Sequence, residues 1–136
     1  MTVKEFLSKI HAVDKRINNK LDQIEGLRSL LERVTPVLTG MPRGGQKDTS
    51  NIVDRIWRLE AAVTDDIDLF VDMVQETRKA IERMDSEFEK YILEARYLVY
   101  WSWDKIAEDY GVSVDTIHRA HGRALQNIKI KLDLQY

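Results

Sequence analysis

Residues 102 to 125 carry the pattern that most restricts how this chain can fold. Two short segments with apolar residues at helical spacing flank Gly111, where the backbone can turn through positive φ without a Cβ clash. Ala107 would lie where the first helix passes closest to the second, and Ile117 would fill the small core between them. The apolar face would be completed by Trp103, Ile106, Tyr110, Val112, Ala120 and Leu125. The spacing predicts a helix-turn-helix.

A serine stands just before each of these two short helices. Ser102 and Ser113 can accept hydrogen bonds from the backbone N–H groups that begin a helix. Asp104 and Asp115 follow in the first turns, where a negative charge suits the helix dipole. The alternative is an ordinary helical hairpin with a glycine cap. The helix-turn-helix is favoured because the small residue, the turn glycine, the core residue and both caps fall in register.

The second helix of the motif is basic, whereas the first is acidic. Residues 116 to 131 contain no Asp or Glu, while residues 104 to 109 hold three acids and one lysine. Positive charge on the second helix suits contact with DNA phosphates, although a solvated basic face is the alternative. Arg119 and Arg123 are the best candidates for contact with a guanine edge or a phosphate. The expected DNA-facing residues are Ser113, Val114, Asp115, Thr116, His118, Arg119, Gly122 and Arg123.

Two long amphipathic segments precede the motif. Residues 35–50 hold both prolines and three of the six glycines, which predicts a loop. In residues 2–34 and 51–85, apolar residues recur at near-heptad spacing. Thr2 and Glu5 form a capping box at the start of the first segment. Since the two segments match in length, an antiparallel helical hairpin is the simplest arrangement, with an intermolecular coiled coil as the alternative.

The expected protein is therefore all-α, a long antiparallel helical hairpin followed by a helix-turn-helix. We expect an arm over residues 1–85 and a helix-turn-helix DNA-binding domain over residues 86–136, with Ser86 starting a new helix. The apolar stripes of the arm, which include Ile56, Trp57, Phe70 and Met73, are too broad for one hairpin to cover. The uncovered part would pack against the C-terminal helices or, in the slightly favoured alternative, form a homodimer.

Catalytic, metal and cofactor sites are not expected. The chain has no cysteine, and its histidines His11, His118 and His121 lack convincing acid, base or nucleophile partners. His118 and His121 have a possible metal spacing, but no nearby residue completes a site. Both are therefore expected at the DNA groove or on the plain surface. Helical spacing would scatter the acidic residues Asp65, Asp66, Asp68 and Asp72 around a solvated face.

The overall charge and hydropathy indicate a cytoplasmic protein without a membrane partner. The net charge is −2, so affinity for DNA would have to come from local charge. No opening apolar run resembles a signal peptide, and no stretch approaches the length of a membrane span.

Three runs of residues resemble the promoter-reading C-terminal domain of bacterial sigma factors. They are Arg96-Tyr97-Leu98, residues 102–107 (Ser-Trp-Asp-Lys-Ile-Ala) and residues 116–125 (Thr-Ile-His-Arg-Ala-His-Gly-Arg-Ala-Leu). With Gly40-Met41-Pro42-Arg43-Gly44 after a leucine-rich helix, the chain is more similar to small phage and prophage transcriptional regulators of the ArpU and RinA type. This resemblance implies a regulator of phage or mobile-element genes that acts with host RNA polymerase. It also implies that Thr116, His118, Arg119 and Arg123 face DNA.

The chain departs from sigma factors in being acidic just ahead of the second helix, at Glu108, Asp109 and Asp115. A second interpretation is therefore a protein-interaction module. In that case the helix-turn-helix would dock on RNA polymerase or another regulator without reading DNA itself.

Overall fold

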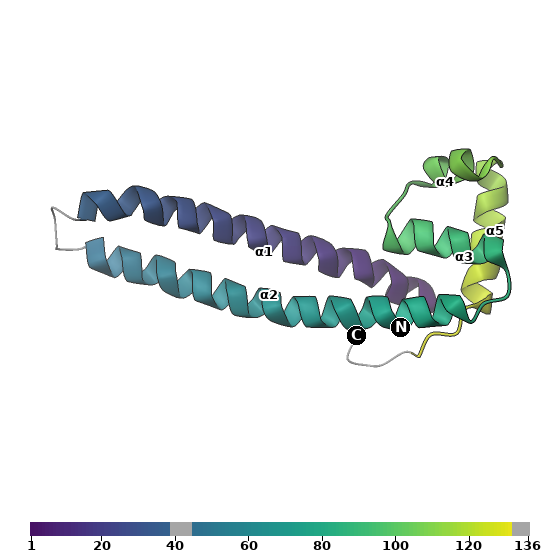
Figure 1. Ribbon diagram of the computed structural model, residues 1–136, viewed down its shortest axis with the longest axis horizontal. Helices are drawn as coiled ribbons and strands as arrows, with labels where there is room; N and C mark the ends of the chain where they lie inside the picture. The colour runs from purple at the N-terminus through teal and green to yellow at the C-terminus, as the bar shows by residue number, and fades with distance from the viewer. Residues whose placement is uncertain (39–44, 132–136) are drawn as a thin grey trace. The chain divides into compact units, whose positions relative to one another are not determined.

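The computed structural model describes the backbone of residues 1–38 and 45–131, and the side chains of residues 1–34 and 49–131. The described part is all-helical, as predicted, and contains no strand. Its elements are α1 (Val3–Leu38), α2 (Gly45–Glu82), α3 (Glu87–Leu93), the π-helical turn η1 (Glu94–Leu98), α4 (Trp103–Tyr110) and α5 (Val114–Asn127) (Figure 1). None of the described helices combines the length and the apolar character needed to cross a membrane.

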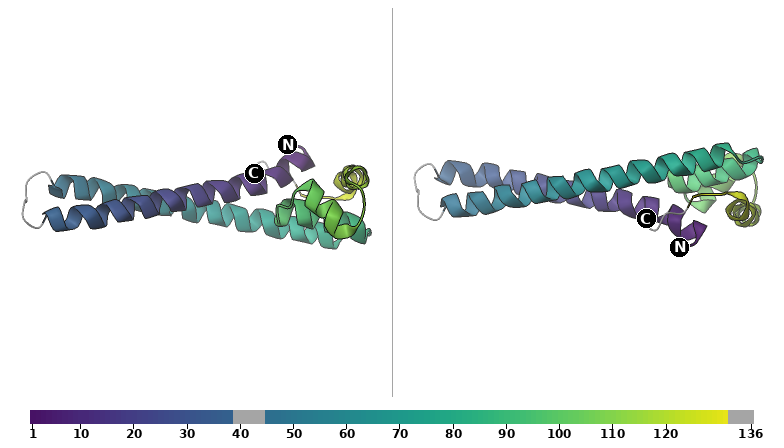
Figure 2. Two further views of the ribbon diagram at one scale, coloured as in Figure 1. Left: turned by 90° about the horizontal axis from the view of Figure 1, so that it is seen from above. Right: turned by 90° about the horizontal axis from the view of Figure 1, so that it is seen from below.

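The two long helices α1 and α2 pack against each other as an antiparallel hairpin, which confirms the predicted arrangement (Figures 1 and 2). Contacts along the chain define two compact units, one of Met1–Val13 with Leu69–Tyr136 and one of Asp14–Asp68. The division cuts through both long helices, whereas the sequence placed a domain boundary between residues 85 and 86. That domain boundary stays a prediction.

The long helices extend into the segment that was predicted as a loop. Residues 35–38 belong to α1 and residues 45–50 belong to α2, so the loop prediction was wrong there, and residues 39–44 lie outside the described residues. Pro36 falls in the last turn of α1, where the N–H it lacks costs the helix one bond close to its end. The second helix also stops at Glu82 rather than at residue 85. There the N–H of Met84 donates to the Ile81 carbonyl at 3.0 Å, which tightens the final turn.

The unit of Met1–Val13 with Leu69–Tyr136 has a dense core where α1 begins and α2 ends. Its fully buried side chains include Phe6, Leu7, Ile10, Met73, Thr77 and Ile81. The Thr77 hydroxyl donates to the Met73 carbonyl at 2.8 Å, so its burial leaves no polar atom unpaired. The predicted capping box is confirmed, because the Thr2 N–H donates to the Glu5 carboxylate at 2.9 Å and the Glu5 N–H donates to Thr2 Oγ1 at 3.1 Å.

The unit of Asp14–Asp68 has a sparser apolar seam and a buried carboxylate. Among its described side chains, the buried apolar residues are Ile17, Ile24, Ile56 and Val63. Asp66 is 8% exposed and accepts hydrogen bonds from Arg16 at 2.9 Å and from Lys20 at 2.6 Å. The solvated position expected for Asp66 was therefore wrong, because this carboxylate lies on the seam opposite two cations of α1. Burial on its own would raise the pKa of Asp66, but the bonds from Arg16 and Lys20 hold that pKa below its usual value.

Apolar side chains remain uncovered in the same unit. Trp57 is 67% exposed, Leu21 is 45% exposed and Ile67 is 42% exposed. Trp57 was placed on an apolar stripe too broad for one hairpin to cover, and its exposure in the single chain agrees with that prediction.

Candidate nucleic-acid interface

The turn between α4 and α5 is built as the sequence predicts. Gly111 has a φ of 82°, in the left-handed region that a side chain would strain. The Ala107 carbonyl accepts from the N–H groups of both Gly111, at 2.9 Å, and Val112, at 3.1 Å, which closes the end of α4. Ser102 accepts from the Lys105 N–H and Ser113 accepts from the Thr116 N–H, each at 3.2 Å. Both predicted N-caps are thus confirmed.

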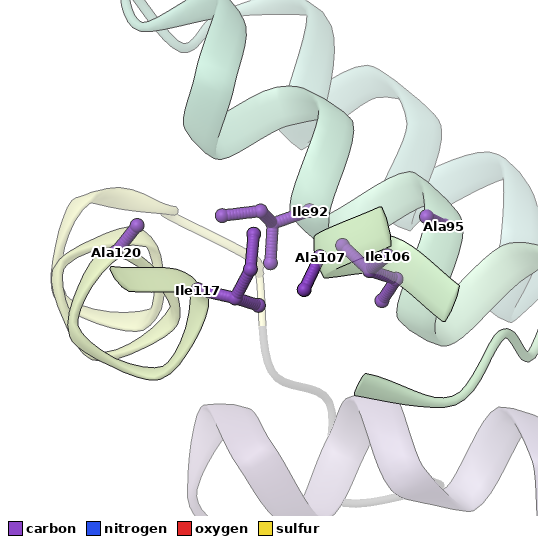
Figure 3. Packing of buried hydrophobic residues seen from close by; sticks show 6 residues of the cluster. All are labelled: Ile92, Ala95, Ile106, Ala107, Ile117 and Ala120. Carbon is purple, nitrogen blue, oxygen red and sulfur yellow. The ribbon is translucent and has the colours of Figure 1, made fainter. Parts of the chain in front are cut away.

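A small apolar cluster, here called the motif core, fixes α5 against α3 and α4. It consists of Ile92, Ala95, Ile106, Ala107, Ile117 and Ala120, all at most 5% exposed. Ile117 projects from α5 toward Ile92 and Ala107 (Figure 3). The small Ala107 leaves room for that side chain, so the two roles expected from the sequence are confirmed. Ser86 also caps α3, as predicted, by accepting from the Glu89 N–H at 3.2 Å.

The residues predicted to face DNA fall on the outward side of α5. Ser113, Asp115, His118, Arg119, Gly122 and Arg123 are exposed, while Val114 and Thr116 are half-buried. Val114 packs partly against the motif core, and the Thr116 hydroxyl lies 2.8 Å from that of Ser113. Val114, Thr116 and the capping Ser113 are therefore engaged within the motif, and the outward face is carried by the other five residues.

This outward face is positive and open at its centre. Arg119 Nε donates to the Asp115 carbonyl at 3.4 Å, and neither Arg119 nor Arg123 pairs with a carboxylate among the described side chains. Between them lies Gly122, where an added Cβ would meet no heavy atom within 4 Å. No contact inside the described part of the chain requires this glycine. A helix surface of this kind can approach a phosphate backbone or base edges closely.

His121 does not belong to that face, and the expected groove or surface position for it was wrong. It is 8% exposed, and its Nε2 lies 2.7 Å from the Tyr97 hydroxyl. The burial follows from position, since residues 117, 120, 121 and 124 form the inward side of α5. This spacing can be read from the sequence, but the basic residues of the helix favoured the outward side of α5 for His121. Tyr110 was predicted on the apolar face of the motif, and this was wrong. It is 46% exposed and stacks on Phe88 at the surface.

Burial and the neighbouring charges of Lys4, His118 and Arg96 lower the pKa of His121 from 6.5 to about 4. The unfolded chain therefore binds a proton that the folded chain rejects, and the free energy of unfolding should fall as the pH drops from about 6.5 to about 4. Carboxylates titrate in part of this range, so the measurement is a comparison by urea unfolding at pH 7 and pH 5. His121→Gln, which can keep a hydrogen bond to Tyr97, should lose less stability than the parent. Equal losses of stability in the parent and the variant would contradict the role of His121 in this pH dependence.

An aromatic and cationic stack, which the sequence analysis missed, borders the outward face of α5. The Trp103 ring lies 4.9 Å from the His118 ring, and the Arg96 guanidinium carbon lies 4.3 Å from the centre of a Trp103 ring. Arg96 is held there by donating to the Trp101 carbonyl at 3.0 Å. The π-helical turn η1 places Arg96, because Val99 bonds back to Glu94 at 3.1 Å and so shifts the register of the helix.

The chemistry of the site has to be interpreted from its own geometry. Within the described residues, no group of three or more histidine or acidic side chains is placed to hold a metal ion. No family model, no curated protein and no solved structure matches this chain.

Proposed function

We propose that this protein is a sequence-specific DNA-binding transcriptional regulator in which α5 reads the major groove of double-stranded DNA. The observation that carries the proposal is the outward face of α5, where Arg119 and Arg123 flank the open surface at Gly122 without carboxylate partners among the described side chains. The capped turn and the motif core hold this helix rigidly, which direct contact with base edges requires. The regulated genes, on the resemblance to regulators of the ArpU and RinA type, are those of a phage or another mobile element.

The decisive experiment is selection of bound sequences from a pool of random DNA duplexes, followed by titration of the selected duplex at several salt concentrations. A groove reader should enrich one sequence, and its binding should weaken steeply with salt as phosphate contacts release counterions. A scrambled duplex of the same length is the control and should bind much more weakly. Absence of enrichment together with salt-independent binding would reject the proposal.

A homodimer is part of the same proposal, because a single recognition helix covers only a few base pairs. The exposed Trp57 and Ile67 in the unit of Asp14–Asp68 give such a dimer an apolar contact surface. We expect light scattering at micromolar concentration to give a dimer. The double substitution Trp57→Gln with Ile67→Gln should give a monomer of unchanged helicity, since neither side chain is buried. Asp65→Asn, at an exposed position of the same helix that points in a different direction from both Trp57 and Ile67, should leave the dimer intact. A monomeric parent protein would exclude this arrangement.

The acidic outward surface of α4 favours a second partner. Asp104, Glu108 and Asp109 are exposed, and their charge opposes contact between this helix and phosphates. The same surface suits a basic patch on a protein such as RNA polymerase. If the protein binds polymerase but enriches no DNA sequence, the interaction-module interpretation replaces the DNA-reading one.

A further inference from the structure

A basic pocket lies beside the candidate interface, within the unit of Met1–Val13 with Leu69–Tyr136. Its walls carry three basic side chains, Lys4, His11 and Arg96, and three aromatic rings, those of Tyr97, Tyr100 and Trp103. None of the described side chains that line it is a carboxylate. Its volume is about 260 Å³, which is room for a phosphate group with the sugar attached to it, and is less than a typical drug-sized site.

The walls of the pocket are fixed by contacts other than those a ligand would make. One guanidinium nitrogen of Arg96 donates to the Trp101 carbonyl, and one face of the guanidinium packs on the Trp103 ring. The remaining N–H groups of Arg96 can therefore donate to a ligand. His11, which also lines the pocket, stacks on Tyr100 with ring centres 4.2 Å apart. Tyr100 adopts a φ of 68°, uncommon for a residue with a side chain, and this turn brings its ring over α1. A strained residue in the wall of a basic pocket is typical of a functional site.

The described side chains around the pocket carry an excess of positive charge. Lys4 and Arg96 form no ion pair with a carboxylate among the described side chains. Apart from burial, the influences that lower the pKa of the neighbouring His121 come from Lys4, His118 and Arg96, all of them basic residues. Cations gathered without a counter-charge attract an anion, and a planar arginine beside a lysine is suited to phosphate oxygens.

We propose that the basic pocket binds a phosphate group, with Arg96 and Lys4 as its principal ligands. Trp103 lines the pocket and also contacts His118 on the outward face of α5. A DNA strand bordering the groove could therefore supply the phosphate, and in that form the inference rests on the proposed function. A free mononucleotide offers the same chemistry and is the other source.

The test uses the full chain with two probes and one central variant, Lys4→Gln, at an exposed position whose side chain supports no core packing. Lys9→Gln is the matched control, since it removes the same charge from the same helix but does not line the pocket. With the selected duplex, Lys4→Gln should reduce the slope of log K against log salt by about 0.9, the loss of one phosphate contact. With deoxyadenosine monophosphate, the parent should show saturable NMR shifts at Lys4, Arg96 and Tyr100 that Lys4→Gln weakens.

Each outcome either identifies the source of the bound phosphate or rejects the proposal. A change of the DNA slope alone identifies the DNA backbone as the source, and a change of nucleotide binding alone identifies a small ligand. If Lys4→Gln and Lys9→Gln behave alike with both probes, the inference is wrong. If Lys4→Gln weakens DNA binding while substitutions at Arg119 and Arg123 do not, the pocket stands and the groove-reading role of α5 fails. Arg96→Gln is a supporting variant, with its melting temperature measured because Arg96 also contacts Trp101 and Trp103.

Discussion

Alanine at Arg119 or at Arg123 should weaken binding to the selected DNA by about 1–3 kcal/mol, or roughly 5- to 150-fold for each residue. Both side chains are exposed, and Arg119 makes only a long bond to a backbone carbonyl of its own helix, so the melting temperature should hardly change. Fluorescence anisotropy gives the affinity and circular dichroism the stability. The double variant should lose nearly all preference over scrambled DNA.

The matched control is the double substitution Arg78→Ala with Arg83→Ala, which removes the same charge from one exposed position in the last turns of α2 and one just after its end. It should change binding little. A base-reading arginine relaxes preference at one position of the site, whereas a phosphate-contacting arginine weakens all sequences alike and flattens the salt slope. Full affinity in both single variants would remove α5 from the interface.

Ala107→Leu should unfold or splay the helix-turn-helix, at a cost of about 1–3 kcal/mol in the free energy of unfolding. Ala107 is 4% exposed and lies in the motif core near Ile117, so a larger side chain must push α4 away from α5. The movement would also disturb the bonds that Gly111 and Val112 make to the Ala107 carbonyl. DNA binding should fall although no DNA-facing group has changed. Thermal unfolding and anisotropy measure the two effects.

Glu108→Leu introduces the same side chain at the exposed neighbouring position and should melt close to the parent. If the Ala107→Leu protein kept parental melting and parental DNA binding, the crossing of α4 and α5 would have to lie elsewhere.

Local chemistry made the helix-turn-helix predictable. Gly111 and the capping residues Ser102 and Ser113 act within four residues of themselves, and each lies where its spacing indicated. The hairpin was predictable because the apolar repeats are long and match in length. The burial of Asp66 could not be predicted, because it depends on two cations of α1 that no local pattern reveals. The inward side of α5, which carries His121, follows from helical spacing alone, and only the bond of His121 to Tyr97 depends on a distant partner.

At residues 35–38 and 45–50, the loop prediction failed for a different physical reason. Residues 35–50 were assigned from proline and glycine content, yet a proline in the last turn of a long helix removes one backbone bond and leaves the preceding turns intact. The pocket was missed because Lys4 and Arg96, the two basic side chains proposed to bind phosphate, lie more than ninety residues apart and only the fold brings them together.

The buried Asp66 also determines how the two long helices can slide past each other. Near-heptad apolar repeats fit almost as well after a shift of seven residues, about 10 Å along the helix axis. Such a shift would carry Arg16 and Lys20 away from the carboxylate and leave a buried charge unpaired, at a cost of about 3–5 kcal/mol. The apolar seam thus stabilises the association of α1 and α2, while the pairing of Asp66 with Arg16 and Lys20 selects one alignment of the two helices.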